Sequence, residues 1–119
     1  LAGLLMAISA DWTRAVLVND PGRGNANLAA FDLEEMSTIG EAFPGFGVPG
    51  TVMLSPDGEL LLYESRESGE SQIYCIRFPS GDGRWQVSGD GGRLPQWSPD
   101  GASAFYLNTD GELIRVPLT

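Results

Sequence analysis

The sequence contains no lysine and no histidine, and these absences exclude several kinds of active site. Without lysine there is no P-loop lysine, no phosphate-binding lysine of a kinase and no Schiff-base chemistry. Without histidine there is no serine–histidine–aspartate or cysteine–histidine arrangement and no histidine-ligated metal. The sequence therefore favours a protein that is not an enzyme, with no catalytic residues, no metal and no cofactor.

Cysteine occurs once, as Cys75. A single cysteine can form neither an intrachain disulfide nor a thiolate zinc site, so cysteine usage leaves the redox compartment open. Cys75 stands between Tyr74 and Ile76, where a small buried side chain is more common than a reactive thiol. We expect it to be buried.

Positive charge is also scarce, because seven arginines face sixteen acidic residues and the net charge at pH 7 is −9. This balance disfavours a nucleic-acid partner, whose binding depends on cationic contacts to phosphates. The apolar opening, residues 1–8, is too short to span a bilayer, so no membrane insertion is expected. It is either an inner strand or the end of a signal peptide.

The chain does contain a repeated turn. Ser-Pro-Asp-Gly occurs at residues 55–58 and 98–101, each time before a strand that ends in tyrosine, Tyr63 or Tyr106. The two aspartates, at positions 57 and 100, are 43 residues apart, a period typical of propeller blades. Asp-Gly between apolar runs predicts a β-hairpin. We assign a structural role in these turns to Ser55, Asp57, Gly58, Ser98, Asp100 and Gly101.

A diverged copy of the turn, Ser9-Ala10-Asp11-Trp12, lies 46 residues before the first repeat, with Asp11 in the place of Asp57. Trp12 stands where the other copies have glycine, the residue that most readily adopts a positive φ. We therefore expect the first turn to be longer or differently shaped.

The units resemble the WD-like β-propeller repeat of TolB and of propeller regions attached to bacterial serine/threonine kinases. The resemblance is carried by Ser55-Pro56-Asp57-Gly58, Ile73-Tyr74, Arg77-Phe78-Pro79, Gly83-Arg84-Trp85, Trp97-Ser98-Pro99-Asp100-Gly101 and Val116-Pro117. It implies a bacterial protein, a six-bladed ring and, by analogy with TolB, a periplasmic or other extracytoplasmic location; a cytoplasmic location stays open.

The expected fold is all-β, a partial β-propeller of about three blades in units 1–49, 50–92 and 93–119. Each blade is a four-stranded antiparallel sheet, and the last lacks its outer strand. Four aromatic residues are expected to pack between blades: Tyr63, Tyr106, Trp85 and Trp97. Three blades leave apolar flanks uncovered, so we expect a homo-oligomer, preferably a two-fold dimer that closes the ring. The rival is one piece of a longer propeller.

The expected function is that of a non-enzymatic binding or protein-interaction module. The resemblance implies that partners meet the face with the blade-linking loops and the loops between second and third strands, here 19–25, 41–49, 66–70 and 89–93. The candidate contacts there are Arg23, Phe43, Phe46, Arg66 and Arg93. The alternative is a fragment of a larger propeller protein, such as a glycosidase-like enzyme with two carboxylates or the sensor region of a receptor kinase.

Overall fold

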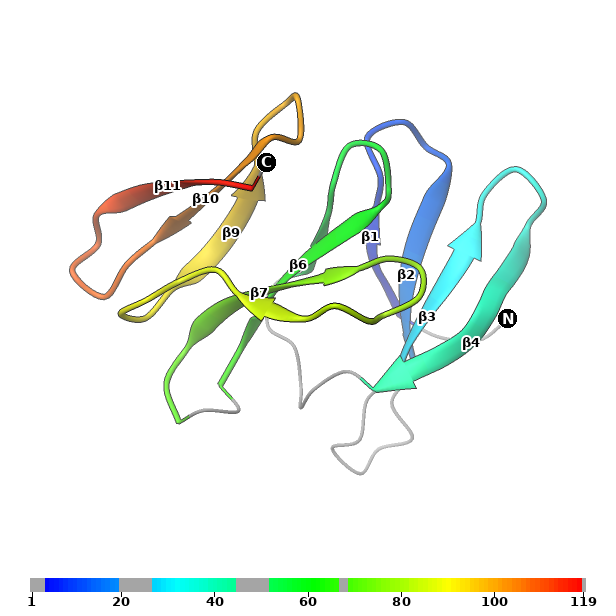
Figure 1. The fold of residues 1–119 in the computed structure, drawn as a ribbon. Coiled ribbons are helices and arrows are strands. Elements are labelled where there is room, and N and C mark those ends of the chain that lie inside the picture. Colours follow the sequence, from blue (N-terminus) through cyan, green and yellow to red (C-terminus); the bar gives the residue numbers. More distant parts are fainter. Residues whose placement is uncertain (1–3, 20–26, 45–51, 67–68, 119) are drawn as a thin grey trace.

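The structure, a computed structural model, describes residues 4–19, 27–44, 52–66 and 69–118, which form three antiparallel sheets (Figure 1). The first sheet contains β1 (Leu4–Ile8), β2 (Arg14–Asn19), β3 (Asn27–Asp32) and β4 (Ser37–Pro44). The second contains β5 (Val52–Leu54), β6 (Leu60–Ser65), β7 (Gln72–Arg77) and β8 (Trp85–Gln86). The third contains β9 (Arg93–Trp97), β10 (Ser103–Leu107) and β11 (Leu113–Pro117).

Each sheet is a meander, because every strand pairs with the strand that follows it in sequence. The predicted all-β architecture is confirmed, with two four-stranded sheets and, among the described residues, a third of three strands. Within the described ranges, no helix is long and apolar enough to cross a membrane.

Two outer strands differ from the prediction. The sequence pattern predicts a short outer strand of the first sheet at Met36–Ile39, yet β4 continues to Pro44. The backbone of Phe43 pairs with Leu28, so Phe43 lies in a strand rather than in a linking loop. For the second sheet, the sequence pattern predicts an outer strand over residues 84–88, yet β8 is only Trp85–Gln86.

The core fills the two spaces between neighbouring sheets. Between the first and second sheets, Val16 and Leu28 pack with Tyr63 and Tyr74, whose rings stack 5.6 Å apart. Between the second and third sheets, the buried side chains of Cys75 and Tyr106 pack together with the half-buried Trp97. The expected inter-sheet roles of Tyr63, Tyr106 and Trp97 are confirmed, and so is the burial of Cys75.

Trp85 differs from the expected packing role. It lies in β8, the outer strand of the second sheet, and 36% of its surface is exposed. Among the described residues, the third sheet has no strand equivalent to β8. The repeat therefore gave no second copy of this position from which its place at the edge could be predicted.

The three hairpin turns share one geometry, which corrects the expectation for the first turn. In each, the serine hydroxyl donates to the aspartate carboxylate, at 2.7 Å for Ser9–Asp11, 2.7 Å for Ser55–Asp57 and 2.6 Å for Ser98–Asp100. The residue after each aspartate donates its N–H to the serine carbonyl at 2.9 Å. Trp12 adopts a φ of 60° and thus takes the same conformation as the glycines. The turn is therefore neither longer nor differently shaped.

Candidate binding site

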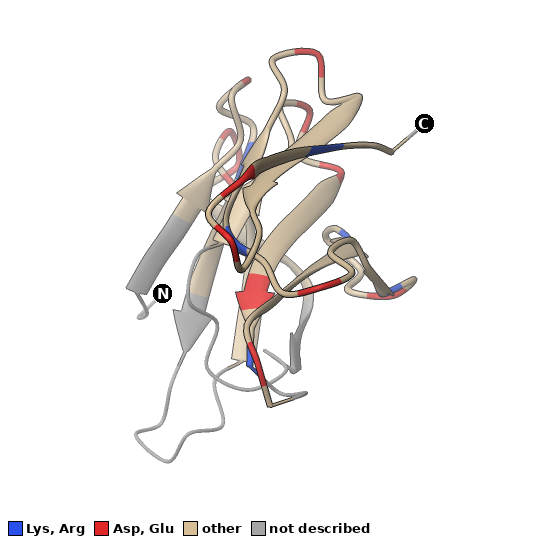
Figure 2. Cartoon of the chain, turned by 90° about the vertical axis from the view of Figure 1, so that its left-hand side faces the viewer, with Lys and Arg blue, Asp and Glu red and all other residues tan. Residues whose placement is uncertain are grey.

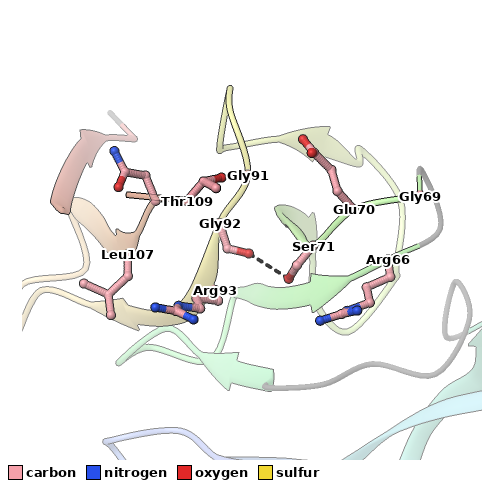
Figure 3. A pocket seen from close by; sticks show the side chains of 10 residues that line it. Arg66, Gly69, Glu70, Ser71, Gly91, Gly92, Arg93, Leu107 and Thr109 are labelled. Carbon is pink, nitrogen blue, oxygen red and sulfur yellow. Dashed lines mark hydrogen bonds between the residues drawn. The ribbon is translucent and has the colours of Figure 1, made fainter. Parts of the chain in front are cut away.

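A hollow of about 330 Å³ opens between the second and third sheets, at the end of the strands opposite to the Ser-x-Asp turns (Figure 3). Three loops surround it: the β6–β7 loop, the β8–β9 link and the β10–β11 loop. The residues that line it are Arg66, Gly69, Glu70, Ser71, Gly91, Gly92, Arg93, Leu107, Asn108 and Thr109.

Glycines let the β8–β9 link pass close to its neighbours. Gly91 has a φ of 80°, and a Cβ built there would collide with Oγ1 of Thr109. A Cβ on Gly92 would lie 2.8 Å from the side chain of Ile73 and 2.9 Å from that of Ser88. A side chain at either glycine would therefore push the link away from the sheets on both sides of the hollow.

Hydrogen bonds fix the floor of the hollow. The Ser71 hydroxyl donates to the carbonyl of Gly92 at 2.8 Å, and the Gly92 N–H donates to the Ser71 carbonyl at 2.8 Å. The Glu64 carboxylate lies 2.9 Å from the same Ser71 hydroxyl, whose single proton is shared between these two acceptors. Glu64 also accepts from the Leu94 N–H at 3.1 Å. The polar groups below the two arginines of the hollow are thus held in place before any ligand arrives.

Arg66 and Arg93 supply the positive charge of the hollow. Arg66 directly follows β6 and Arg93 begins β9, and both are exposed. Figure 3 shows their side chains on either side of the Ser71–Gly92 hydrogen bond. Neither guanidinium forms a hydrogen bond or an ion pair with the residues that the structure describes. The nearby Glu64 carboxylate contacts the Ser71 hydroxyl and the Leu94 N–H, and Glu70 lines the hollow as well.

The structure brings two of the five predicted contact residues together. Arg66 and Arg93 line the same hollow, as loops 66–70 and 89–93 meet there. Phe43 lies in β4, on the first sheet, and its side chain falls outside the described residues. Arg23 and Phe46 also lie outside the described residues.

The third wall of the hollow contains residues that were not among the predicted contacts. Leu107, Asn108 and Thr109 come from the end of β10 and the β10–β11 loop, which occupies the same place in the third sheet as loop 66–70 does in the second. The repeat could have predicted this wall, because Tyr63 and Tyr106 end equivalent strands. The loop that begins at Asn108 is therefore the counterpart of loop 66–70.

Cys75 and the aspartates of the repeated turns have structural surroundings. The described residues contain no cluster of cysteine, aspartate or glutamate side chains suited to a metal ion. Cys75 is buried, and burial raises the pKa of its thiol to about 12, so the reactive thiolate is disfavoured at neutral pH. Asp57 and Asp100 accept hydrogen bonds within their turns. The charged side chains that line the hollow are those of Arg66, Arg93 and Glu70.

Comparisons with known proteins match the architecture. TolB from Acinetobacter baumannii superposes with a TM-score of 0.67 at 19% identity, covering 100% of this chain and 32% of that one. A TolB-like protein from Agrobacterium tumefaciens gives 0.66 at 16% identity, covering 97% of this chain and 49% of that one. The fold is that of a TolB-type β-propeller. The three sheets are its blades, and the hollow lies between the second and third blades.

The same blades occur in proteins of other functions. An oligogalacturonate lyase solved in complex with manganese superposes with a TM-score of 0.61 at 15% identity, covering 94% of this chain and 33% of that one. The chain thus spans between about a third and a half of the length of these propeller proteins. No protein-family model matches the sequence, and no curated protein matches it either.

Proposed function

We propose that the chain is a non-enzymatic β-propeller binding module that recognises an acidic segment of a partner protein at the hollow between its second and third blades. The observation that supports this is the pair Arg66 and Arg93, two guanidinium groups on one preformed site of a chain with a net charge of −9. In such a chain most arginines are expected to find acidic neighbours. Glu70 lines the same hollow, but neither guanidinium is paired with a carboxylate among the described residues, which favours a ligand that brings its own negative charge.

The shape of the guanidinium group favours carboxylates. Its planar fork donates two parallel hydrogen bonds to one carboxylate, and such charge-assisted bonds are about twice as strong as neutral ones. Two arginines on either side of the Ser71–Gly92 hydrogen bond suit two acidic side chains of an extended segment.

Fluorescence anisotropy with a labelled peptide tests this function. The probe is a short blocked peptide in which glutamate and glycine alternate, and the reference is the same peptide with glutamine in place of glutamate. Arg66→Gln and Arg93→Gln should each weaken binding of the acidic peptide about tenfold, since a hydrogen bond to a charged group contributes ~1.5–3 kcal/mol. Arg77→Gln, an equal charge change at the opposite end of β7, is the matched control. Equal binding of both peptides would contradict the proposal.

We also propose that two copies assemble into a closed ring. The strand alternation in β10 and β11 directs Phe105, Leu113 and Pro117 away from the second blade, and Leu113 is 68% exposed. On the opposite flank, alternation in β2 and β3 directs Leu17 and Phe31 away from the second blade. A two-fold dimer would place the third blade of each copy against the first blade of the other, covering both flanks.

A second candidate is that the chain forms part of a larger propeller protein, such as a glycosidase-like enzyme or the sensor region of a receptor kinase. The share of the solved propellers that it spans, between 32% and 49%, favours this alternative. The two proposals differ in what covers the flanks, a second copy or further blades, and solution mass separates them.

A further inference from the structure

The first hairpin turn contains a tryptophan in a backbone conformation that suits glycine. Trp12 has a φ of 60°, and the equivalent Gly58 and Gly101 have φ values of 75° and 72°. A side chain in this left-handed region places its Cβ against the neighbouring carbonyl oxygen, so tryptophan costs stability there. Trp12 is also 69% exposed and therefore gains little from burial within the chain. The turn requires a positive φ, but nothing in the turn requires tryptophan.

A second residue of the same kind lies in the adjacent turn. Met36, between β3 and β4, has a φ of 54° and is 69% exposed. The two turns are joined by a hydrogen bond from the Leu33 N–H to the Thr13 carbonyl at 3.0 Å, and Figure 1 shows both at the same end of the first blade. Two large apolar residues, each with a positive φ and each exposed, thus lie in adjacent turns at one end of the first blade.

Leu94 is a third exposed apolar residue with a positive φ, but it lies in a strand. Its φ is 55° and it is 56% exposed, but its N–H donates to the Glu64 carboxylate at 3.1 Å, beside a register shift between β9 and β10. The conformation of Leu94 accompanies an irregularity of its strand, and that of Trp12 is held by the hydrogen bonds of its turn. Trp12 and Met36 differ from Leu94 in that the two exposed apolar residues occupy adjacent turns.

Around this surface, acidic residues outnumber Arg14, which begins β2 and donates to the Gly58 carbonyl of the neighbouring turn. Asp11 precedes Trp12, and Glu34 and Glu35 precede Met36; all three carboxylates are exposed. The Asp11 N–H donates to a carbonyl of the neighbouring turn at 3.2 Å, and that turn adds the exposed Asp57. Figure 2 shows acidic residues in the turns at the upper end of the blades. A partner with positive charge around its own apolar residues would complement this surface.

We propose that Trp12 and Met36 form a second docking surface, which binds a basic, arginine- or lysine-bearing segment of a partner protein. The indole ring offers a face for a guanidinium or ammonium group, and the methionine thioether adapts to apolar side chains beside it. This surface lies at the opposite end of the strands from Arg66 and Arg93, so the two sites can be occupied independently and have opposite charge preference.

Anisotropy with a labelled, blocked peptide of alternating lysine and leucine tests the proposal, with a glutamate–leucine peptide as the reference. Trp12→Gly leaves the net charge unchanged, and it should weaken lysine–leucine binding about tenfold or more, as for a central aromatic anchor. The same substitution should raise the unfolding temperature, because the backbone conformation then suits the residue. Leu94→Gly, which relieves a similar backbone conformation elsewhere, should leave peptide binding unchanged. Trp12→Asn, also suited to positive φ, repeats the test independently.

Three results would overturn the proposal. One is unchanged lysine–leucine binding in both Trp12 variants, and another is equal binding of the lysine and glutamate peptides. A third is a fall in solution mass caused by Trp12→Gly, which would make the surface a contact between copies. The acidic glutamate–glycine peptide tests the Arg66–Arg93 hollow at the other end of the strands. A failure of that peptide to bind would therefore not change the outcome expected for the lysine–leucine peptide.

Discussion

The indole N–H of Trp97 donates a hydrogen bond of 2.9 Å to the main-chain carbonyl of Met53. Trp97 ends β9 and Met53 lies in β5, so the bond joins the innermost strands of the third and second blades. The position equivalent to Trp97 in the second blade is Leu54, which has no donor for such a bond. This polar link therefore belongs to one blade junction, the one that also contains the Arg66–Arg93 hollow.

Trp97→Phe should destabilise the fold. It removes the donor and leaves the partly buried Met53 carbonyl without this partner, which costs about 1–3 kcal/mol. Urea unfolding monitored by circular dichroism measures the change. Trp85→Phe is the matched control: Trp85 is 36% exposed at the edge of the second blade, and its substitution should change the free energy of unfolding by less than about 0.5 kcal/mol. Equal effects of the two substitutions would contradict the assigned role of Trp97.

Stability should fall in alkaline solution. Burial raises the pKa of the Cys75 thiol from 9.0 to about 12, and burial likewise raises the pKa of Tyr63 from 10.0 to about 12. The folded state therefore holds these protons while the unfolded state releases them, so the free energy of unfolding decreases as pH rises above about 9. Unfolding curves recorded from about pH 8 to about pH 11, which bracket the two unfolded-state values, measure the slope. Cys75→Ala should make the slope shallower; an unchanged slope would show that Cys75 does not contribute.

Assembly of two copies should depend on the outer face of the third blade. Leu113→Glu places a charge on this face without disturbing the core, because Leu113 is 68% exposed. Light scattering behind a sizing column should report twice 12.7 kDa for the original chain and 12.7 kDa for the variant. Gln86→Glu, on the exposed strand β8, controls for the added charge. A folded monomer of the original chain would contradict the dimer and favour the larger propeller.

The repeat of Ser-Pro-Asp-Gly was sufficient to predict the fold, because serine, aspartate and glycine build the same hydrogen-bonded turn at both places where this spacing occurs. The prediction failed at Trp12, since the Ser9 and Asp11 hydrogen bonds preserve the turn even when its glycine is replaced. Local hydrogen bonding outweighed the conformational preference of one residue, and a rule based on glycine alone could not show that.

The binding site was predictable only in part. Arg66 and Arg93 were selected because they lie in loops that reach one face of a propeller, and the structure places them in one hollow. Thr109 lines the hollow only because the second and third blades pack closely. A side chain on Gly91 would collide with the Thr109 hydroxyl. Such a contact between segments from two blades has no signature in either segment alone.

The most direct measurement of the central claim is a double-mutant cycle on Arg66 and Arg93 with the blocked glutamate–glycine peptide. If both arginines hold one acidic segment, each single glutamine variant weakens binding about tenfold. The double variant then binds no better than the glutamine–glycine reference. Arg77→Gln keeps the original affinity. An original chain that binds the acidic and neutral peptides equally, or single variants that lose nothing, would contradict the account of this hollow as a carboxylate-binding site.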